Sequence, residues 1–139
     1  MRVAFPSGTR SAPLDRNPLR LALGGGSGHG GGTSITYVDY TVPANRRADI
    51  QMARGFYVVT TVLAAGQNES IHLDLANVAI PNWVFNISIV AAPVGDKGAF
   101  EAEHLFLVAG DHIQIISTLA AGAGVVTAGG AISGVEYDA

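Results

Sequence analysis

Alternation of apolar and polar positions recurs along the chain and predicts β-strands. The clearest segment is 70–76, where Ile71, Leu73 and Leu75 fall on one face and polar residues on the other. A period of two places successive side chains on opposite faces of a strand. No stretch keeps a helical period for long, so we expect an all-β domain.

Turn-forming residues separate further strand-like runs. Gly, Pro and Asn recur between runs rich in Val, Ile, Thr and Tyr, a spacing typical of antiparallel β-sandwiches. The predicted strands are 34–42, 46–53, 56–65, 70–76, 83–92, 99–108, 112–119 and 125–137. We therefore expect an antiparallel β-sandwich of jelly-roll type.

Several predicted strands, such as 56–65, are apolar on both faces. A two-layer sandwich does not require this, because each sheet turns one face to water. Only 14% of the residues are charged, which is below the usual quarter. We therefore expect a second buried surface formed with other copies of the chain. The predicted oligomer interface comprises Tyr57, Val59, Trp83 and Phe106.

The N-terminal part differs in texture from the rest. Three prolines within residues 1–23 favour extended chain, and alternating leucines over Leu19–Leu23 allow a short strand there. Residues 24–32 are glycine at seven of nine positions, which indicates a flexible linker. They lack the lysine and the following helix that a phosphate-binding loop needs. We expect an extended arm and linker over 1–32 and a sandwich domain over 33–139.

Charge is divided unevenly between these parts. Residues 1–20 hold four arginines and one aspartate, and the remainder holds four basic and ten acidic residues. A basic arm on an acidic body suits docking to an acidic surface, although a solvated tail is an equally simple interpretation. The candidate partner-binding residues are Arg2, Phe5, Arg10, Leu14, Arg16, Leu19, Arg20 and Leu21.

No constellation of reactive side chains is visible. The chain has no cysteine, which excludes thiolate metal ligands and cysteine nucleophiles. His72 and Asp74 could supply two metal ligands, but no third ligand is apparent. Glu101 and Glu103 share a strand face that we interpret as solvated. No serine stands in a strand-to-helix elbow. We predict no catalytic, metal or cofactor site, and no enzyme activity.

Two other classes of partner receive little support from the sequence. The long uncharged runs 75–95 and 113–135 are broken by Pro, Asn and Gly, so we expect strands there and no membrane span. Four arginines without interleaved aromatics make a thin nucleic-acid footprint, so we expect no nucleic-acid partner. Trp83 and the tyrosines could form a sugar-stacking surface, although an aromatic anchor in the core or an interface is more usual.

Three short motifs resemble a known family. Tyr40–Ala48 (YTVPANRRA), Leu107–Asp111 (LVAGD) and Ile132–Tyr137 (ISGVEY) are similar, in this order, to small head-decoration (cement) proteins of tailed bacteriophages. The similarity covers 37–137, and residues 1–32 have no counterpart in it.

The resemblance implies a virion protein without enzyme activity. Such a protein forms a homotrimer on the outer surface of the capsid, binds the major capsid protein and clamps neighbouring capsomers. A phage tail or fibre module that binds a host glycan is the alternative, because such modules use similar sandwiches.

Overall fold

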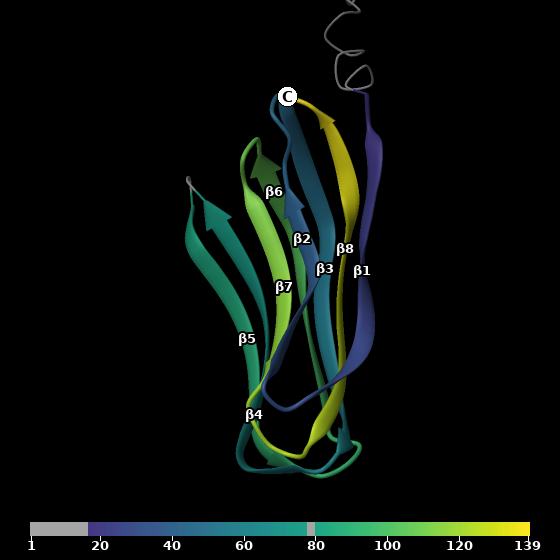
Figure 1. Ribbon diagram of the computed structural model, residues 1–139. Helices are drawn as coiled ribbons and strands as arrows, with labels where there is room; N and C mark the ends of the chain where they lie inside the picture. The colour runs from purple at the N-terminus through teal and green to yellow at the C-terminus, as the bar shows by residue number, and fades with distance from the viewer. Residues whose placement is uncertain (1–16, 78–79) are drawn as a thin grey trace, which may run out of the picture.

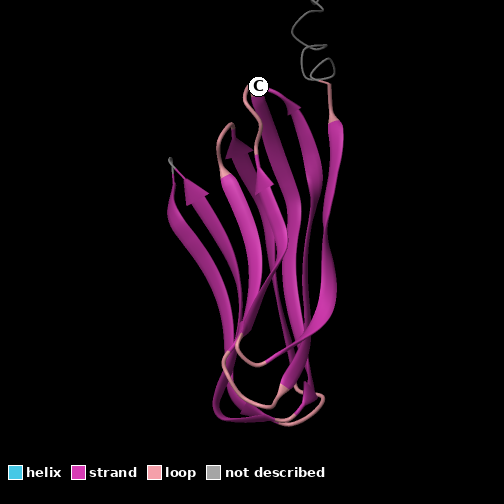
Figure 2. Ribbon diagram, in the orientation of Figure 1, coloured by secondary structure: helices cyan, strands magenta, loops and turns pink. Residues whose placement is uncertain are grey.

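The structure is a computed structural model that describes residues 17–77 and 80–139, with the side chains of residues 17–75 and 92–139. This part of the chain contains eight β-strands and no helix (Figure 2). The strands are β1 (Leu19–Gly30), β2 (Thr33–Thr41), β3 (Arg46–Thr61), β4 (Leu63–Asn77), β5 (Ile80–Ala92), β6 (Lys97–Val108), β7 (His112–Leu119) and β8 (Val125–Asp138).

The strands form two four-stranded sheets, which run along the same long axis (Figure 1). One sheet has the order β1-β8-β3-β6 and is called the β1 sheet below. The other has the order β2-β7-β4-β5 and is called the β2 sheet. Every pairing between neighbouring strands is antiparallel. The prediction of an all-β chain with antiparallel sheets is confirmed.

The hydrophobic core lies between the two sheets. Ile71 and Leu73 of β4 and Ile113 and Ile115 of β7 are fully buried, and they alternate with residues on the outer face. The predicted inward face of 70–76 is therefore confirmed. A Cβ atom on Gly130 of β8 would lie 2.5 Å from Cγ2 of Ile115, so the two sheets approach each other closely there.

Strand β3 is longer than predicted. We expected two strands separated at Gly55, but β3 continues through this residue and pairs with both β6 and β8. Gly55 is needed for packing, because a Cβ atom there would lie 2.7 Å from Cε2 of Phe100 and 2.9 Å from Cγ2 of Ile71. The glycine therefore makes room for two core side chains without ending the strand.

The prediction of a flexible linker over residues 24–32 is wrong. Residues Gly24–Gly30 form the second half of β1 and pair with β8 in register, from Gly24 opposite Ala131 to Gly30 opposite Val125. Backbone hydrogen bonds need no side chains, so a glycine run can complete a sheet whose other strands are already fixed. We expected the sandwich domain to begin at residue 33, but β1 (Leu19–Gly30) is already a strand of the β1 sheet. The sheets therefore begin before the predicted domain boundary.

Candidate interaction surfaces

A polar network joins the two sheets at the end of the molecule where β1 begins; we call it the Arg46 end. Arg46 Nε donates to Glu136 Oε1 at 2.9 Å, and its guanidinium also contacts the Asp138 carboxylate. Arg46 Nη2 donates to the backbone oxygen of Asn17 at 3.0 Å. The Tyr40 hydroxyl donates to Glu136 Oε2 at 2.5 Å. These contacts hold Asn17, the first residue that the structure describes, against β3 and β8.

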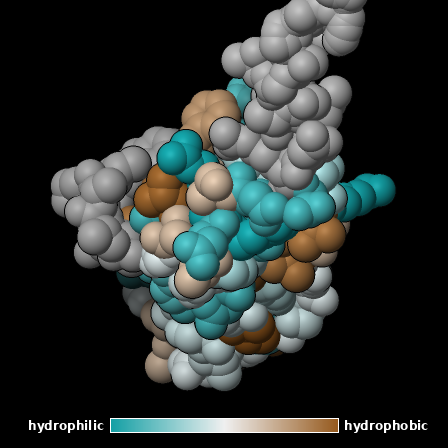
Figure 3. Space-filling model, turned by 90° about the horizontal axis from the view of Figure 1, so that it is seen from above, coloured by the Kyte–Doolittle hydropathy of each residue, from teal (hydrophilic) through white to brown (hydrophobic). Residues whose placement is uncertain are grey.

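The electrostatics of the Arg46 end follow from these contacts. The hydrogen bond from Asn17 Nδ2 at 2.7 Å, followed by that from Arg46, lowers the pKa of Asp138 from its ordinary value. Burial, followed by the hydrogen bond to Glu136, raises the pKa of Tyr40. Hydrophilic side chains cover much of this end, with separate hydrophobic patches between them (Figure 3).

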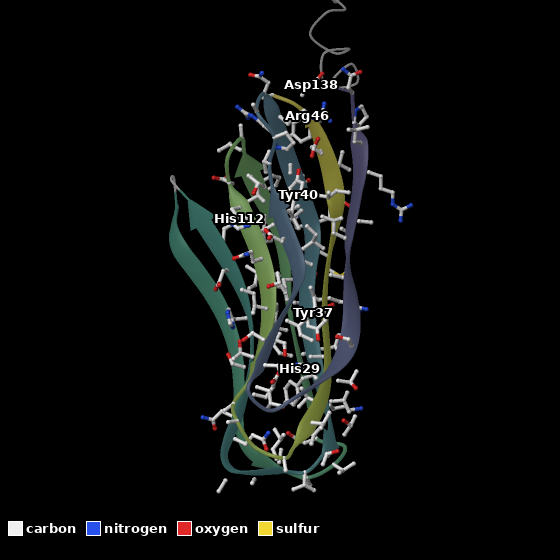
Figure 4. The ribbon with its side chains drawn as sticks, viewed as in Figure 1. His29, Tyr37, Tyr40, Arg46, His112 and Asp138 are labelled. Carbon is white, nitrogen blue, oxygen red and sulfur yellow. The ribbon has the colours of Figure 1, made fainter. Side chains whose placement is uncertain are left out.

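The three motifs that carry the family resemblance meet at this end. Val42 N donates to Asp111 O, and Gly110 N donates to Val42 O, both at 2.9 Å, so the first motif is bound to the second. Arg46 and Glu136 join the first motif to the third. Segments that are far apart in sequence thus form one structural unit at the Arg46 end, where Figure 4 labels Tyr40 and Arg46.

The predicted partner-binding residues divide into two groups. Leu19 and Arg20 are exposed on β1, whereas Leu21 packs against the core and is only partly accessible. The other candidates precede Asn17 and lie outside the described residues: Arg2, Phe5, Arg10, Leu14 and Arg16.

Two of the four predicted interface residues are core residues. Tyr57 is 4% exposed and Val59 is 1% exposed, because both point inward from β3. Their assignment to an oligomer interface is therefore wrong. Phe106 lies on the outer face of β6 and is 67% exposed, as an interface residue requires. The side chain of Trp83 lies outside the described part of the chain.

Phe56 explains why β3 is apolar on its outer face as well. A Cβ atom on Gly129 of β8 would lie 2.5 Å from Cε1 of Phe56, and one on Gly26 of β1 would lie 3.5 Å from its Cζ. The aromatic ring therefore lies over glycines of the adjacent strand β8 and of β1 beyond it. This packing partly buries Phe56 within a single chain, whereas Val62 of the same run is 57% exposed.

Three exposed apolar side chains remain on the outer face of β3 and β6, and we call them the patch. They are Met52, Phe106 and Val108, which are 40%, 67% and 44% exposed, and their cross-strand partners are the charged residues Glu103, Asp49 and Arg47. The ring of His104 stacks on Phe106 with centroids 6.4 Å apart, and His104 has a positive φ of 55°. Exposed aromatic and methionine side chains are typical of protein interfaces.

The outer face of the β2 sheet is more polar. His72 Nε2 lies 3.5 Å from Asp74 Oδ2, and His112 Nε2 contacts the Asp39 carboxylate. In the described part of the chain, no group of three or more His, Asp or Glu residues could hold a metal ion. The same residues include no helix that is long and apolar enough to cross a membrane.

A second polar network lies inside the other end of the molecule. His29 of β1 is 7% exposed, and its Nε2 lies 2.7 Å from Oγ of the fully buried Ser117 of β7. Ser117 Oγ is in turn 2.5 Å from Oε1 of the fully buried Glu69 of β4. The hydrophobic pattern of the sequence does not indicate this network. The one signal in the sequence is that His29 is the only bulky side chain in residues 24–32.

The comparisons with known proteins show the fold alone. No family model and no curated protein matches the chain. It is similar to part of dimeric latent PorU from Porphyromonas gingivalis, with a TM-score of 0.52 and 10% identity over 89% of this chain. The match spans only 13% of the PorU chain.

Two other solved structures are less similar. The structure of infectious bursal disease virus Gx strain has a TM-score of 0.40 and 14% identity, over 89% of this chain and 32% of that chain. FLHE has a TM-score of 0.38 and 13% identity, over 88% of this chain and 98% of that chain. Neither likeness is strong enough to carry an argument about function.

Proposed function

We propose that the protein is a non-enzymatic capsid decoration protein that binds the outer surface of a phage head and stabilises the contacts between capsomers. The observation that carries this proposal is the meeting of the three family-like motifs at the Arg46 end, where hydrogen bonds join Val42 to Asp111 and Arg46 to Glu136. If the three short matches were coincidental, there would be no reason for them to contact one another in the folded chain.

The strand order supports a jelly roll as the finer description of the fold. A jelly roll has eight antiparallel strands in two sheets, each of which combines strands from both halves of the chain. The orders β1-β8-β3-β6 and β2-β7-β4-β5 fit this description. Jelly rolls occur in viral capsid and lectin domains, so the fold suits both the decoration protein and the glycan-binding alternative.

The N-terminal segment is the proposed attachment to the major capsid protein. Residues 1–16 contain three of the eight basic residues of the chain and join the body at Asn17, which Arg46 holds in place. A basic segment on each copy can add weak contacts with the major capsid protein. When three copies bind together, avidity makes the trimer bind far more tightly than one copy would.

The patch of Met52, Phe106 and Val108 is the proposed contact between copies in a homotrimer. Native mass spectrometry should give a species of about three chains. Replacing the central residue, Phe106→Ser, should shift the protein toward the monomer. Val94→Ser is the matched control, since Val94 is also an exposed apolar residue, at 60%, but lies outside the patch. Equal effects of the two substitutions would rule out this interface.

Co-sedimentation with heads assembled without the protein tests the function itself. The full-length protein should bind such heads, and a chain that begins at Asn17 should remain folded but bind more weakly. Arg47→Gln, at an exposed arginine of the body, serves as the control for a general loss of positive charge. If the full-length protein does not co-sediment with heads but binds a host glycan, the tail-module alternative is supported instead.

A further inference from the structure

Four side chains and one backbone oxygen form a continuous chain of short contacts between the two sheets. It runs from Glu69 Oε1 to Ser117 Oγ at 2.5 Å, and from there to His29 Nε2 at 2.7 Å. It continues from His29 Nδ1 to Thr33 Oγ1 at 2.7 Å and ends with Thr33 Oγ1 at 2.5 Å from Gly30 O. The chain thereby links β4, β7, β1 and β2.

Counting hydrogens along this chain restricts its protonation. The Thr33 hydroxyl must donate to Gly30 O, because a carbonyl oxygen can only accept. Thr33 therefore accepts from His29, so that Nδ1 carries a proton. Ser117 has one hydrogen and two partners, so it can donate either to His29 or to Glu69, and the other partner must donate to it.

With one proton shared between Glu69 and His29, two arrangements satisfy all the contacts. Either Glu69 is a neutral acid and His29 is neutral, or Glu69 is a carboxylate and His29 is a cation. The other carboxyl oxygen, Oε2, is buried and has no hydrogen-bond partner among the described residues. A charged oxygen in that position would be costly, whereas the carbonyl oxygen of a neutral acid is tolerated more easily.

We propose that Glu69, Ser117 and His29 form a proton-dependent lock, in which a proton on Glu69 sets the direction of the hydrogen bonds that tie the glycine-rich half of β1 to β7 and keeps Thr33 bound to Gly30. The lock matters because Gly24–Gly30 has few side chains to pack, and His29 is its one large inward-pointing group. When Glu69 loses its proton, Ser117 turns to donate to the carboxylate. His29 must then donate from Nε2, and Thr33 must leave Gly30 to donate to Nδ1.

The surroundings of the lock agree with this assignment. Burial raises the pKa of Glu69 to about 7, against a smaller opposing effect of the hydrogen bond with Ser117. Burial lowers the pKa of His29. Tyr57 faces Glu69 from β3, and its pKa is raised by burial, by Asp96 and, to a smaller degree, by Glu69. In the strand register, Leu119 and Ile89 are the partners of Glu69, and Val126 is the partner of His29; all three are apolar residues.

The direction of the pH effect follows from these values. Glu69 loses its proton near 4.5 in an unfolded chain and near 7 in the folded protein, so the stability it contributes is complete below 4.5 and is lost as the pH rises through about 7. The stability contributed by neutral His29 is complete above 6.5 and declines as the pH falls below it. Between 4.5 and 6.5 these two contributions oppose each other, so a variant at Glu69 is needed to separate them.

The tautomer of His29, measured by nitrogen NMR of the imidazole in the full-length protein, tests the lock directly. In the wild type, the imidazole proton should be on Nδ1 near pH 6 and on Nε2 by about pH 9. The reason is that loss of the Glu69 proton exchanges donors and acceptors along the series of hydrogen bonds. Glu69→Gln keeps a permanent donor toward Ser117, so His29 should stay protonated at Nδ1 throughout. Glu101→Gln, at an exposed glutamate of β6, should behave as the wild type does.

Chemical unfolding provides the second readout. The ratio of the wild-type unfolding constant to that of Glu69→Gln should rise on the order of 100-fold as the pH increases from below 4.5 to above 7. A wild-type His29 that keeps one tautomer over the whole range, or is a cation at pH 6, would overturn the proposal. The wild-type NMR measurement decides this even if Glu69→Gln does not fold.

Discussion

The Tyr40 hydroxyl donates a 2.5 Å hydrogen bond to Glu136 and thereby ties β2 of one sheet to β8 of the other. At the opposite end of the molecule, His29 and Ser117 tie β1 to β7 at 2.7 Å (Figure 4). Each end of the body therefore has a polar side-chain link between the sheets, while the centre is filled by apolar side chains.

Removing the Tyr40 hydroxyl should weaken the Arg46 end. We expect Tyr40→Phe to lower the free energy of unfolding by about 1–2 kcal/mol, because Glu136 loses a hydrogen-bond donor in a partly buried place. Urea unfolding measures the change. Tyr37→Phe is the matched control, since the Tyr37 hydroxyl makes longer contacts of 3.2 and 3.3 Å with Ser27 at an exposed position. Equal losses in the two variants would contradict this account.

Arg46 should contribute more to the free energy of unfolding than any exposed arginine among the described residues. Its side chain is 15% exposed, and it joins Glu136, Asp138 and the backbone of Asn17. We expect Arg46→Gln to lower the free energy of unfolding more than the exposed neighbouring control Arg47→Gln does, because it removes hydrogen bonds to Glu136, Asp138 and Asn17 together. An unchanged free energy would show that the network adds no stability.

The same network predicts a response to acid. Because the hydrogen bonds from Asn17 and Arg46 lower the pKa of Asp138, its contribution is complete above its ordinary value of 3.8 and is lost as the pH falls through the lowered value. The difference in unfolding free energy between the wild type and Asp138→Asn should therefore be constant at neutral pH and shrink in acid. A difference that does not change with pH would contradict the assignment.

Packing of Phe56 over Gly129 leads to a further prediction. A Cβ atom on Gly129 would lie 2.5 Å from Cε1 of Phe56 and 2.6 Å from Gly25 O, so Gly129→Ala should destabilise the protein by about 1–3 kcal/mol. Gly25→Ala is the control, because no heavy atom lies within 4 Å of a Cβ atom there. Thermal unfolding of the two variants measures the difference, and similar melting temperatures would argue against this packing.

Strands with regular alternation could be predicted from the sequence, whereas the glycine strand could not. The predicted strand 112–119 coincides with β7, because every second residue there is buried. In Gly24–Gly30 most positions have no side chain, so no hydrophobic pattern exists to detect. Its place is fixed by backbone pairing with β8, which only the folded structure reveals.

The interface prediction failed at Tyr57 and Val59 for a related reason. A run that is apolar on both faces does not reveal what covers its second face. Here that face is covered in part by the ring of Phe56 lying over Gly129 of the neighbouring strand. The lock was equally invisible, because its residues are far apart in sequence: His29 and Ser117 are separated by 88 positions, and Glu69 and Ser117 by 48.

We propose that the protein decorates the outside of a phage head, and cryo-electron microscopy of heads assembled with and without the protein can test this. A decoration protein should add trimeric density on the outer surface, at three-fold positions between capsomers. Identical heads in both preparations, or additional density confined to the tail, would contradict it.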